Sequence, residues 1–293
     1  MKLFIKYLIL LVIFSLVNGC DKPAPTELIE DDFEVEVITK DTEDEFYTAD
    51  SSGVIENLNR FVNIITVSGL KITTETSTIN GSYAQAIFFD RNNPVFRNGR
   101  LLIYNTRILG DVKFNNIQAS LRPFIVRYRV GNNHNEINIG RRHVLNSFIQ
   151  GEDFNFQYNS TVNFNLDFFP IFGGGSVNFI IPTLSEINGS VIFESNNGNS
   201  EAILRWNKEN YQKFEIIIGA SGGNSEKVFP LFRLKTKDDG ELIVPENLIN
   251  RIPPRFNKLV FTLVRKFESH HPGNNNDLYV LSQSTHSLVV DIP

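Results

Sequence analysis

An alternation of apolar and polar residues between positions 154 and 168 restricts the fold more than any other part of this sequence. Aromatic or aliphatic residues recur at every second position in two runs, and Asn, Gln or Asp residues lie between them. A period of two places successive side chains on opposite faces of an extended chain, so one face is buried and the other meets water. The apolar positions are Phe154, Phe156, Tyr158, Val162, Phe164, Leu166 and Phe168.

Similar short runs continue from about residue 51 to the C-terminus, separated by turn-forming pairs such as Asn98-Gly99. Helical periodicity is nearly absent. The exception is the stretch 245–252, which has Pro245 at a first helical position and is ended by Pro253-Pro254. We therefore expect an all-β fold with at most one short helix, at about 245–252.

The order of these runs predicts two β-sandwich domains in tandem. A glycine-rich break at 173–175 and a strand that ends at Pro182 close the first group of strands, which places the boundary near residues 183–187. The N-terminal sandwich then covers residues 51–185 and the C-terminal sandwich residues 186–293. A chain of this length can rest on its apolar core alone.

The N-terminal segment has the layout of a secretory signal. Two lysines precede an apolar run, Tyr7 to Val17, that is too short to span a bilayer as a helix. The sequence Val17-Asn18-Gly19-Cys20 resembles the lipobox of bacterial lipoproteins. This resemblance implies a signal peptide at 1–19 and lipidation of Cys20, with a diacylglyceryl group on its thiol and an acyl chain on its freed amine. The alternative is cleavage nearby by an ordinary secretory peptidase, which would leave a free thiol.

Cys20 is the only cysteine, so the chain can form no internal disulfide. An unpaired exposed thiol is unusual in an exported protein, which favours lipidation over the free thiol. Three acyl chains exceed the two signals that stable membrane attachment requires. We expect a lipid-anchored protein of the cell envelope, in the outer membrane, with its periplasmic or surface orientation left open.

An acidic segment follows the anchor. Residues 21–50 contain twelve acidic residues and two lysines. Low hydrophobicity and like charge predict a disordered, self-repelling tether over residues 20–50. Within it, Phe33 to Ile38 alternates like a strand, which would allow this piece to add to a sheet edge.

The second half of the chain resembles a known architecture. Frequent turns and an early strand that carries Trp206 resemble an immunoglobulin or fibronectin type III sandwich. The segments 204–207, 214–218, 239–245 and 263–265 resemble the C-terminal domain of two-domain exported bacterial lipoproteins of unassigned activity. The resemblance implies an immunoglobulin-like fold and transfers no catalytic residue.

Residues Gly219 to Gly223 formally match the G-x-S-x-G pattern of serine hydrolases. A nucleophilic Ser221 would need a strand-to-helix turn and a histidine after an intervening acid. Another apolar strand follows instead, so a glycine-rich hairpin is the preferred interpretation. We expect no catalytic residue here.

The five histidines give no metal-binding pattern. No H-x-x-x-H or H-E-x-x-H sequence occurs, and a thiolate zinc site would need a second cysteine. His270-His271 precedes a polar loop, where a surface metal site is the less favoured alternative. We expect neither a metal nor a cofactor. The histidines are His134, His143, His270, His271 and His286.

Two groups of side chains are candidates for ligand contact. Arginines gather in the first predicted domain, where they would bind polyanions or the acidic tether, although outward charges on strands explain most of them. They are Arg91, Arg97, Arg100, Arg107, Arg122, Arg127, Arg129, Arg141 and Arg142. Exposed tyrosines would suit a glycan site, and the pool is Tyr47, Tyr83, Tyr104, Tyr158 and Tyr211.

These patterns favour a membrane-anchored lipoprotein that is not an enzyme and acts as a binding module for a glycan or a protein at the cell envelope. Two alternatives stay open, namely a structural subunit of an outer-membrane assembly and a hydrolase of unrecognised type. The membrane is the expected partner through Cys20. Nucleic acid is not expected, because it would be rare outside the cell.

Overall fold

The computed structural model describes residues 33–37, 63–97, 100–130, 133–147, 154–196, 199–209, 214–222, 228–271 and 278–292. The prediction of an all-β fold is confirmed. The described helical elements are the 3-10 turn η1 (Pro170–Phe172) and the four-residue helix α2 (Glu246–Ile249), which lies inside the expected stretch 245–252.

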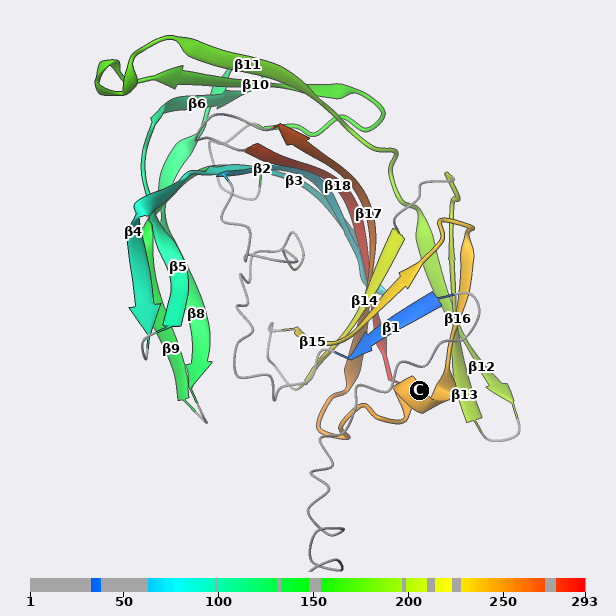
Figure 1. Cartoon of the computed structure of the whole chain (residues 1–293). Helices are drawn as coiled ribbons and strands as arrows, with labels where there is room; N and C mark the ends of the chain where they lie inside the picture. Colours follow the sequence, from blue (N-terminus) through cyan, green and yellow to red (C-terminus); the bar gives the residue numbers. More distant parts are fainter. Residues whose placement is uncertain are drawn as a thin grey trace, which may run out of the picture.

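The fold is organised by one strongly curved sheet of nine strands (Figure 1). Neighbouring strands in this sheet are antiparallel except for β18 and β2, which are parallel. Its strands, in spatial order, are β1 (Phe33–Val37), β15 (Phe229–Thr236), β14 (Phe214–Ser221), β17 (Lys258–His271), β18 (Leu278–Asp291), β2 (Asn63–Thr73), β3 (Thr78–Ile87), β9 (Asn133–Asn146) and β8 (Ser120–Val130).

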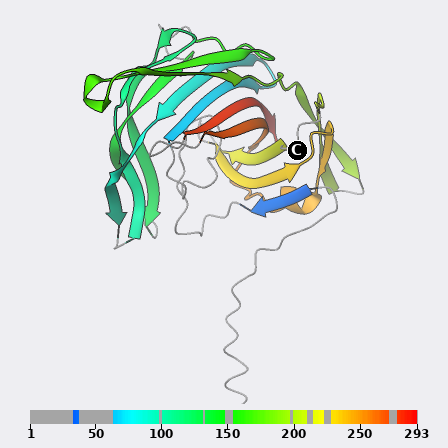
Figure 2. The same cartoon turned by 45° about the horizontal axis from the view of Figure 1, so that its top comes forward.

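Two smaller sheets lie on the outer side of the curve (Figure 2). One has the order β11 (Ser176–Pro182), β10 (Thr161–Phe168), β6 (Gly110–Phe114) and β7 (Ile117–Gln118). The other has the order β12 (Gly189–Asn196), β13 (Asn199–Trp206) and β16 (Glu241–Val244). The hairpin of β4 (Phe89–Arg97) and β5 (Arg100–Thr106) forms a separate two-stranded sheet.

Each small sheet covers its own hydrophobic core. One core includes Phe114, Phe154 and Phe164 and otherwise draws on residues 65–181 and Val280. The other core draws on residues 187–288. The two cores therefore separate near the expected boundary at 183–187, where the chain between β11 and β12 forms no strand.

The two predicted sandwiches share the central sheet. Strand β18, near the C-terminus, pairs along its length with β2, from Leu278 opposite Asn63 to Leu288 opposite Thr73. A continuous ladder of hydrogen bonds therefore crosses the boundary that the sequence suggested. The division of the chain into two domains at residue 185 stays a prediction.

The C-terminal half forms a β-sandwich, and its resemblance to immunoglobulin-like domains stays a prediction. The seven strands β12 to β18 form the facing sheets β12-β13-β16 and β15-β14-β17-β18. Trp206 of β13 is buried between them, stacked on Phe214 of β14 with ring centroids 4.6 Å apart and an interplanar angle of 9°. The offset aromatic contact fixes the spacing of the two sheets.

Part of the predicted acidic tether is ordered. Residues 33–37 form β1, which adds to the edge of the central sheet beside β15, with Glu34 opposite Lys235 and Glu36 opposite Arg233 in the register. This pairing confirms the prediction that the segment adds to a sheet edge. The prediction of disorder over the whole of residues 20–50 is wrong for residues 33–37. The predicted signal peptide at 1–19 and Cys20 lie outside the described residues.

The alternating stretch 154–158 is not a strand, and its last residue, Tyr158, begins a turn. Phe154 and Phe156 are buried and Asn155 and Gln157 exposed, as the pattern predicted. The backbone of this stretch forms hydrogen bonds to side chains. The Phe156 N–H donates to Ser82 Oγ (2.9 Å), and the Gln157 carbonyl accepts from Thr183 Oγ1 (2.6 Å). This segment lies against β3 of the central sheet and forms one wall of a pocket.

Candidate functional site

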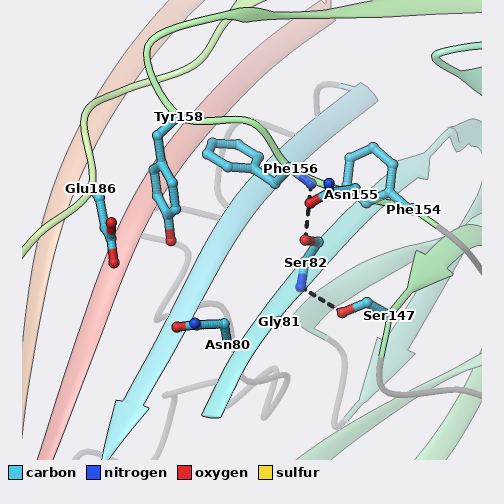
Figure 3. A pocket seen from close by; sticks show the side chains of 9 residues that line it. All are labelled: Asn80, Gly81, Ser82, Ser147, Phe154, Asn155, Phe156, Tyr158 and Glu186. Atoms are coloured by element: carbon cyan, nitrogen blue, oxygen red, sulfur yellow. Dashed lines mark hydrogen bonds between the residues drawn. The ribbon is translucent and has the colours of Figure 1, made fainter. Parts of the chain in front are cut away.

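A pocket of about 540 Å³ opens over β2 and β3, between the segment 154–158 and the connection from β11 to β12 (Figure 3). Three separate parts of the chain meet there, together with the end of β9. The lining residues are Asn80, Gly81, Ser82, Ser147, Phe154, Asn155, Phe156, Tyr158 and Glu186.

Two serines fix the floor of the pocket. The Ser82 N–H donates to Ser147 Oγ (2.7 Å), and the Ser147 N–H donates back to the Ser82 carbonyl (3.0 Å). Ser82 Oγ accepts the Phe156 N–H, so the segment that carries Asn155 is held against β3. These bonds use the backbone groups that an irregular segment would otherwise leave unpaired. The floor is therefore preorganised.

The aromatic wall depends on a glycine. Phe156 and Tyr158 contact each other edge to face, with ring centroids 5.2 Å apart. Both rings pack over Gly69 of β2, where an added Cβ would lie 2.6 Å from a Phe156 ring carbon and 2.7 Å from a Tyr158 ring carbon. Any larger residue at position 69 would displace these rings.

The charges in the pocket nearly cancel. Glu186 Oε1 accepts a hydrogen bond from Lys71 Nζ (2.8 Å), and Lys71 also donates to Asn188 Oδ1 (2.6 Å). Burial and the nearby Glu186 carboxylate raise the pKa of Tyr158 to about 12, so its phenol stays protonated at neutral pH. The pocket thus combines a phenol donor, amides, hydroxyls and one neutralised carboxylate with an aromatic wall.

A buried histidine lies beside the pocket, on the same face of the central sheet. The Gly189 N–H donates to His286 Nδ1 (2.9 Å), so the proton of the neutral ring is on Nε2, which donates to Thr73 Oγ1 (2.9 Å). Burial and, to a smaller extent, the charge of Lys71 lower the pKa of His286 to about 4, and the charge of Glu186 opposes this shift in part. His286 is therefore a neutral ring that joins β18 to the start of β12.

The connection that carries Glu186 is also held from its far side. Asn207 Nδ2 donates to the Glu186 carbonyl (2.9 Å), and Arg265 Nη1 donates to Ser185 Oγ (2.7 Å). Arg265 is itself fixed by a buried carboxylate, Asp238, at 2.7 Å. This chain of contacts positions Glu186 from the core of the C-terminal sandwich.

Among the tyrosines proposed from the sequence, the structure brings Tyr158 into the pocket. Tyr83 is 3% exposed and donates its hydroxyl to Gln85 Oε1 (2.9 Å), and Tyr104 packs against the small core beneath β4 and β5. Tyr47 and Tyr211 lie outside the described residues.

The hairpin interpretation of the Ser221 motif agrees with the structure. Ser221 is the last residue of β14, opposite Lys258 of β17 in the register, and the next described strand, β15, pairs with β14 in the antiparallel sense; residues 223–227, which include Gly223 of the motif, lie outside the described residues. In the part of the chain that the structure describes, the element that follows Ser221 is therefore a strand, whereas a nucleophilic serine requires a strand-to-helix turn.

The histidine side chains that the structure describes do not converge; His134 lies on β9, and its side chain is outside the described set. His143 is buried against the ring of Phe88, His286 lies beside the pocket, and His270 and His271 are the last residues of β17. In the described ranges no group of three or more His, Cys, Asp or Glu residues is arranged to hold a metal ion.

The predicted arginine cluster is separate from the pocket. Arg122, Arg141 and Arg142 lie on the β8–β9 hairpin at one edge of the central sheet. Arg142 lies over the Phe124 ring at 5.1 Å and donates to Gln85 Oε1 (2.7 Å). These arginines are therefore not part of the pocket lining.

Most of the pocket was not predictable from sequence motifs. Alternation drew attention to Phe154, Phe156 and Tyr158, but nothing marked Asn80, Ser82 or Glu186. Their only sequence signal is a polar residue where a neighbouring segment is apolar, which is common on any strand. Their meeting depends on tertiary packing.

Comparison of the chain with models of known protein families, with curated proteins and with solved structures gave no match. Among the described residues, neither helix has the length and apolar character needed to cross a bilayer.

Proposed function

We propose that this chain is a lipoprotein, attached through Cys20 to the outer membrane of a bacterial cell envelope, whose body binds a glycan without chemical conversion. The ligand class is inferred from Tyr158, which is partly buried and lines a pocket of about 540 Å³ together with Asn80, Asn155 and Glu186. The lipobox-like sequence at residues 17–20 supports the anchor.

A sugar matches both kinds of surface in this pocket. Its C–H face is apolar and packs on an aromatic ring, while its hydroxyls need fixed donors and acceptors around the ring edge. Asn80 and Asn155 offer amides, Tyr158 offers a phenol and Glu186 offers a carboxylate oxygen. The near-neutral Lys71–Glu186 pair favours an uncharged glycan over a polyanion.

The lining also supports binding rather than hydrolysis. A glycosidase uses two carboxyl groups that flank the scissile bond. Glu186 is the one acid among the residues that line the described pocket, and its carboxylate is held by Lys71. The geometry therefore provides recognition groups and lacks an acid and base pair.

A Tyr158→Ala chain is expected to bind its glycan about tenfold more weakly, because one aromatic contact in a desolvated site is worth ~1 kcal/mol or more. Binding would be measured by a glycan array followed by calorimetry on the full chain. Asn155→Ala should also weaken binding, whereas Asn178→Ala, which removes an exposed amide on β11, should not. An array without binders, or equal affinities for the Tyr158 and Asn178 variants, would remove the support for this site.

A Gly69→Ala chain provides an independent test of the aromatic wall. The new methyl group would overlap the rings of Phe156 and Tyr158, and such overpacking costs about 1–3 kcal/mol of unfolding free energy. Glycan affinity should fall with it, although no group that faces the ligand has been removed. Urea unfolding and calorimetry check both effects. Unchanged affinity in a chain that is destabilised would show that the rings are not part of the binding surface.

A further inference from the structure

The turn between β10 and β11 exposes a cluster of large apolar side chains. Ile171 is 82% exposed, Phe172 42% and Phe169 37%. With Pro170 they form the apolar tip, residues 169–172, which projects from the end of the four-stranded sheet (Figures 1 and 2). Soluble surfaces rarely gather residues of this size at one projecting point.

The backbone of the apolar tip is hydrogen-bonded within the protein. The Phe172 N–H donates to the Phe169 carbonyl (2.9 Å), and the Gly173 N–H donates to the Pro170 carbonyl (3.0 Å). The Phe169 N–H bonds to the Leu109 carbonyl (3.0 Å), and proline has no N–H to satisfy. Gly173 closes the turn with φ of 96°, a conformation that glycine adopts without strain. Few backbone N–H groups of the tip would therefore be left without a hydrogen bond if the tip moved from water into an apolar phase.

The segment of chain that carries the tip is uncharged. Residues 168–185 contain no Asp, Glu, Lys or Arg. The nearest charged residue in the sequence, Asp167, is paired with Lys113 at 3.1 Å. Neither sign of charge would oppose entry of the tip into an apolar phase, and neither would attract a charged surface.

We propose that the apolar tip inserts into the interfacial region of a lipid bilayer. A bilayer requires apolar side chains, internally bonded backbone groups and no charge, and the tip meets these three conditions together. A protein partner is less well matched, because protein interfaces add a polar rim with about one hydrogen bond per ~100–200 Å², and no side chain in 168–175 can donate or accept one.

Insertion would give the body a contact with the membrane that is separate from the anchor. An acyl anchor alone leaves a tethered body free to rotate, whereas an inserted tip fixes one orientation and therefore the direction in which the pocket faces. This inference does not rest on the glycan pocket, and a chain that binds no glycan would still insert its tip.

A tryptophan placed in the apolar tip would report insertion directly. The native Trp206 is buried, so a Phe172→Trp side chain supplies a distinct exposed signal. With the full chain on phosphatidylcholine vesicles, its emission should shift to the blue and be quenched by brominated acyl chains. Adding Ile171→Asp should abolish the quenching. Raising the salt from ~0.1 to ~1 M should leave it unchanged, because screening does not weaken an uncharged contact.

Ile243→Trp is the matched control. Ile243 is 50% exposed on β16, in a different sheet, and a tryptophan there should remain unquenched on the same vesicles. Equal quenching at both positions would mean nonspecific adhesion and overturn the proposal. So would an unquenched Phe172→Trp signal, including the case in which the tip becomes buried through self-association or in a protein partner.

Discussion

An Asp238→Ala chain is expected to lose about 3–5 kcal/mol of unfolding free energy, the cost of removing one partner from a buried ion pair. Asp238 accepts from Arg265 Nε (2.7 Å) and Nη2 (3.0 Å) and from Trp206 Nε1 (2.8 Å). Asp238 is 2% exposed and Arg265 is fully buried. Without the carboxylate, the guanidinium would remain in the core with its positive charge uncompensated.

An exposed ion pair of similar length provides the control. Arg205 Nε lies 2.6 Å from Glu241 Oε2, but both side chains are 53% exposed. Glu241→Ala should change stability little, because water solvates and screens such pairs. Urea unfolding of both variants tests the contrast. Equal losses for the two would mean that burial does not set the value of the Asp238 contact.

The Asp238 variant should also bind glycan more weakly. Arg265 holds Ser185 through Nη1 and the Asn207 carbonyl through Nη2 (2.7 Å each), and Asn207 holds the backbone of Glu186. Loss of Asp238 frees the guanidinium and loosens this connection. An Asp238→Leu, Arg265→Met chain removes both charges together, and replacement of a whole buried pair is often neutral in stability. If that double variant folds but binds glycan poorly, the pair acts through positioning.

Local patterns in the sequence predicted many elements of the fold, although the alternating stretch 154–158 is not a strand. Alternation specifies which face of a strand is buried, and Pro245 with Pro253-Pro254 delimits a helix, so both could be predicted without tertiary information. The addition of 33–37 to a sheet edge was likewise visible from its alternation.

Long-range pairing could not be predicted in the same way. Strands β2 and β18 pair in parallel although Asn63 and Leu278 lie at opposite ends of the described chain. The alternation of apolar residues in a strand shows which face is buried but does not show which strand pairs with it. The pairing partner therefore depends on the whole fold. The same limit applies to the pocket, where Asn80, Tyr158 and Glu186 meet from distant segments, and to the contacts of Arg265.

A His143→Leu chain is expected to remain folded at neutral pH with equal or higher stability. His143 is 2% exposed and packs edge to face on Phe88, with ring centroids 6.0 Å apart. In the described part of the chain neither ring nitrogen has a hydrogen-bond partner. Leucine therefore removes two unsatisfied polar atoms from a core and loses no hydrogen bond.

The same variant should be more stable than the native chain in acid. Burial lowers the pKa of His143 to about 4 against an ordinary value of 6.5, and the charge of Asp111 opposes this shift in part. Between these two pH values the unfolded chain binds the proton that the folded chain excludes, so folding stability falls as the pH falls from 6.5 toward 4. Leucine abolishes this loss, which we expect to be about 3 kcal/mol. Urea unfolding at several pH values measures it.

A His286→Leu chain is expected to lose stability at neutral pH, in contrast to His143→Leu. Burial is the main cause that lowers the pKa of His286 to about 4, as it is for His143. Both of its ring nitrogens are hydrogen-bonded, one to the Gly189 N–H and the other to Thr73 Oγ1. His286→Leu should therefore lower the unfolding free energy by about 1–3 kcal/mol at neutral pH, because it leaves the Gly189 N–H without an acceptor. The two substitutions remove the same chemical group from equally buried positions, and their effects should differ in sign because only one ring is hydrogen-bonded. If both destabilised the chain equally at neutral pH, packing volume rather than hydrogen bonding would decide the outcome, and the account of His143 would fail.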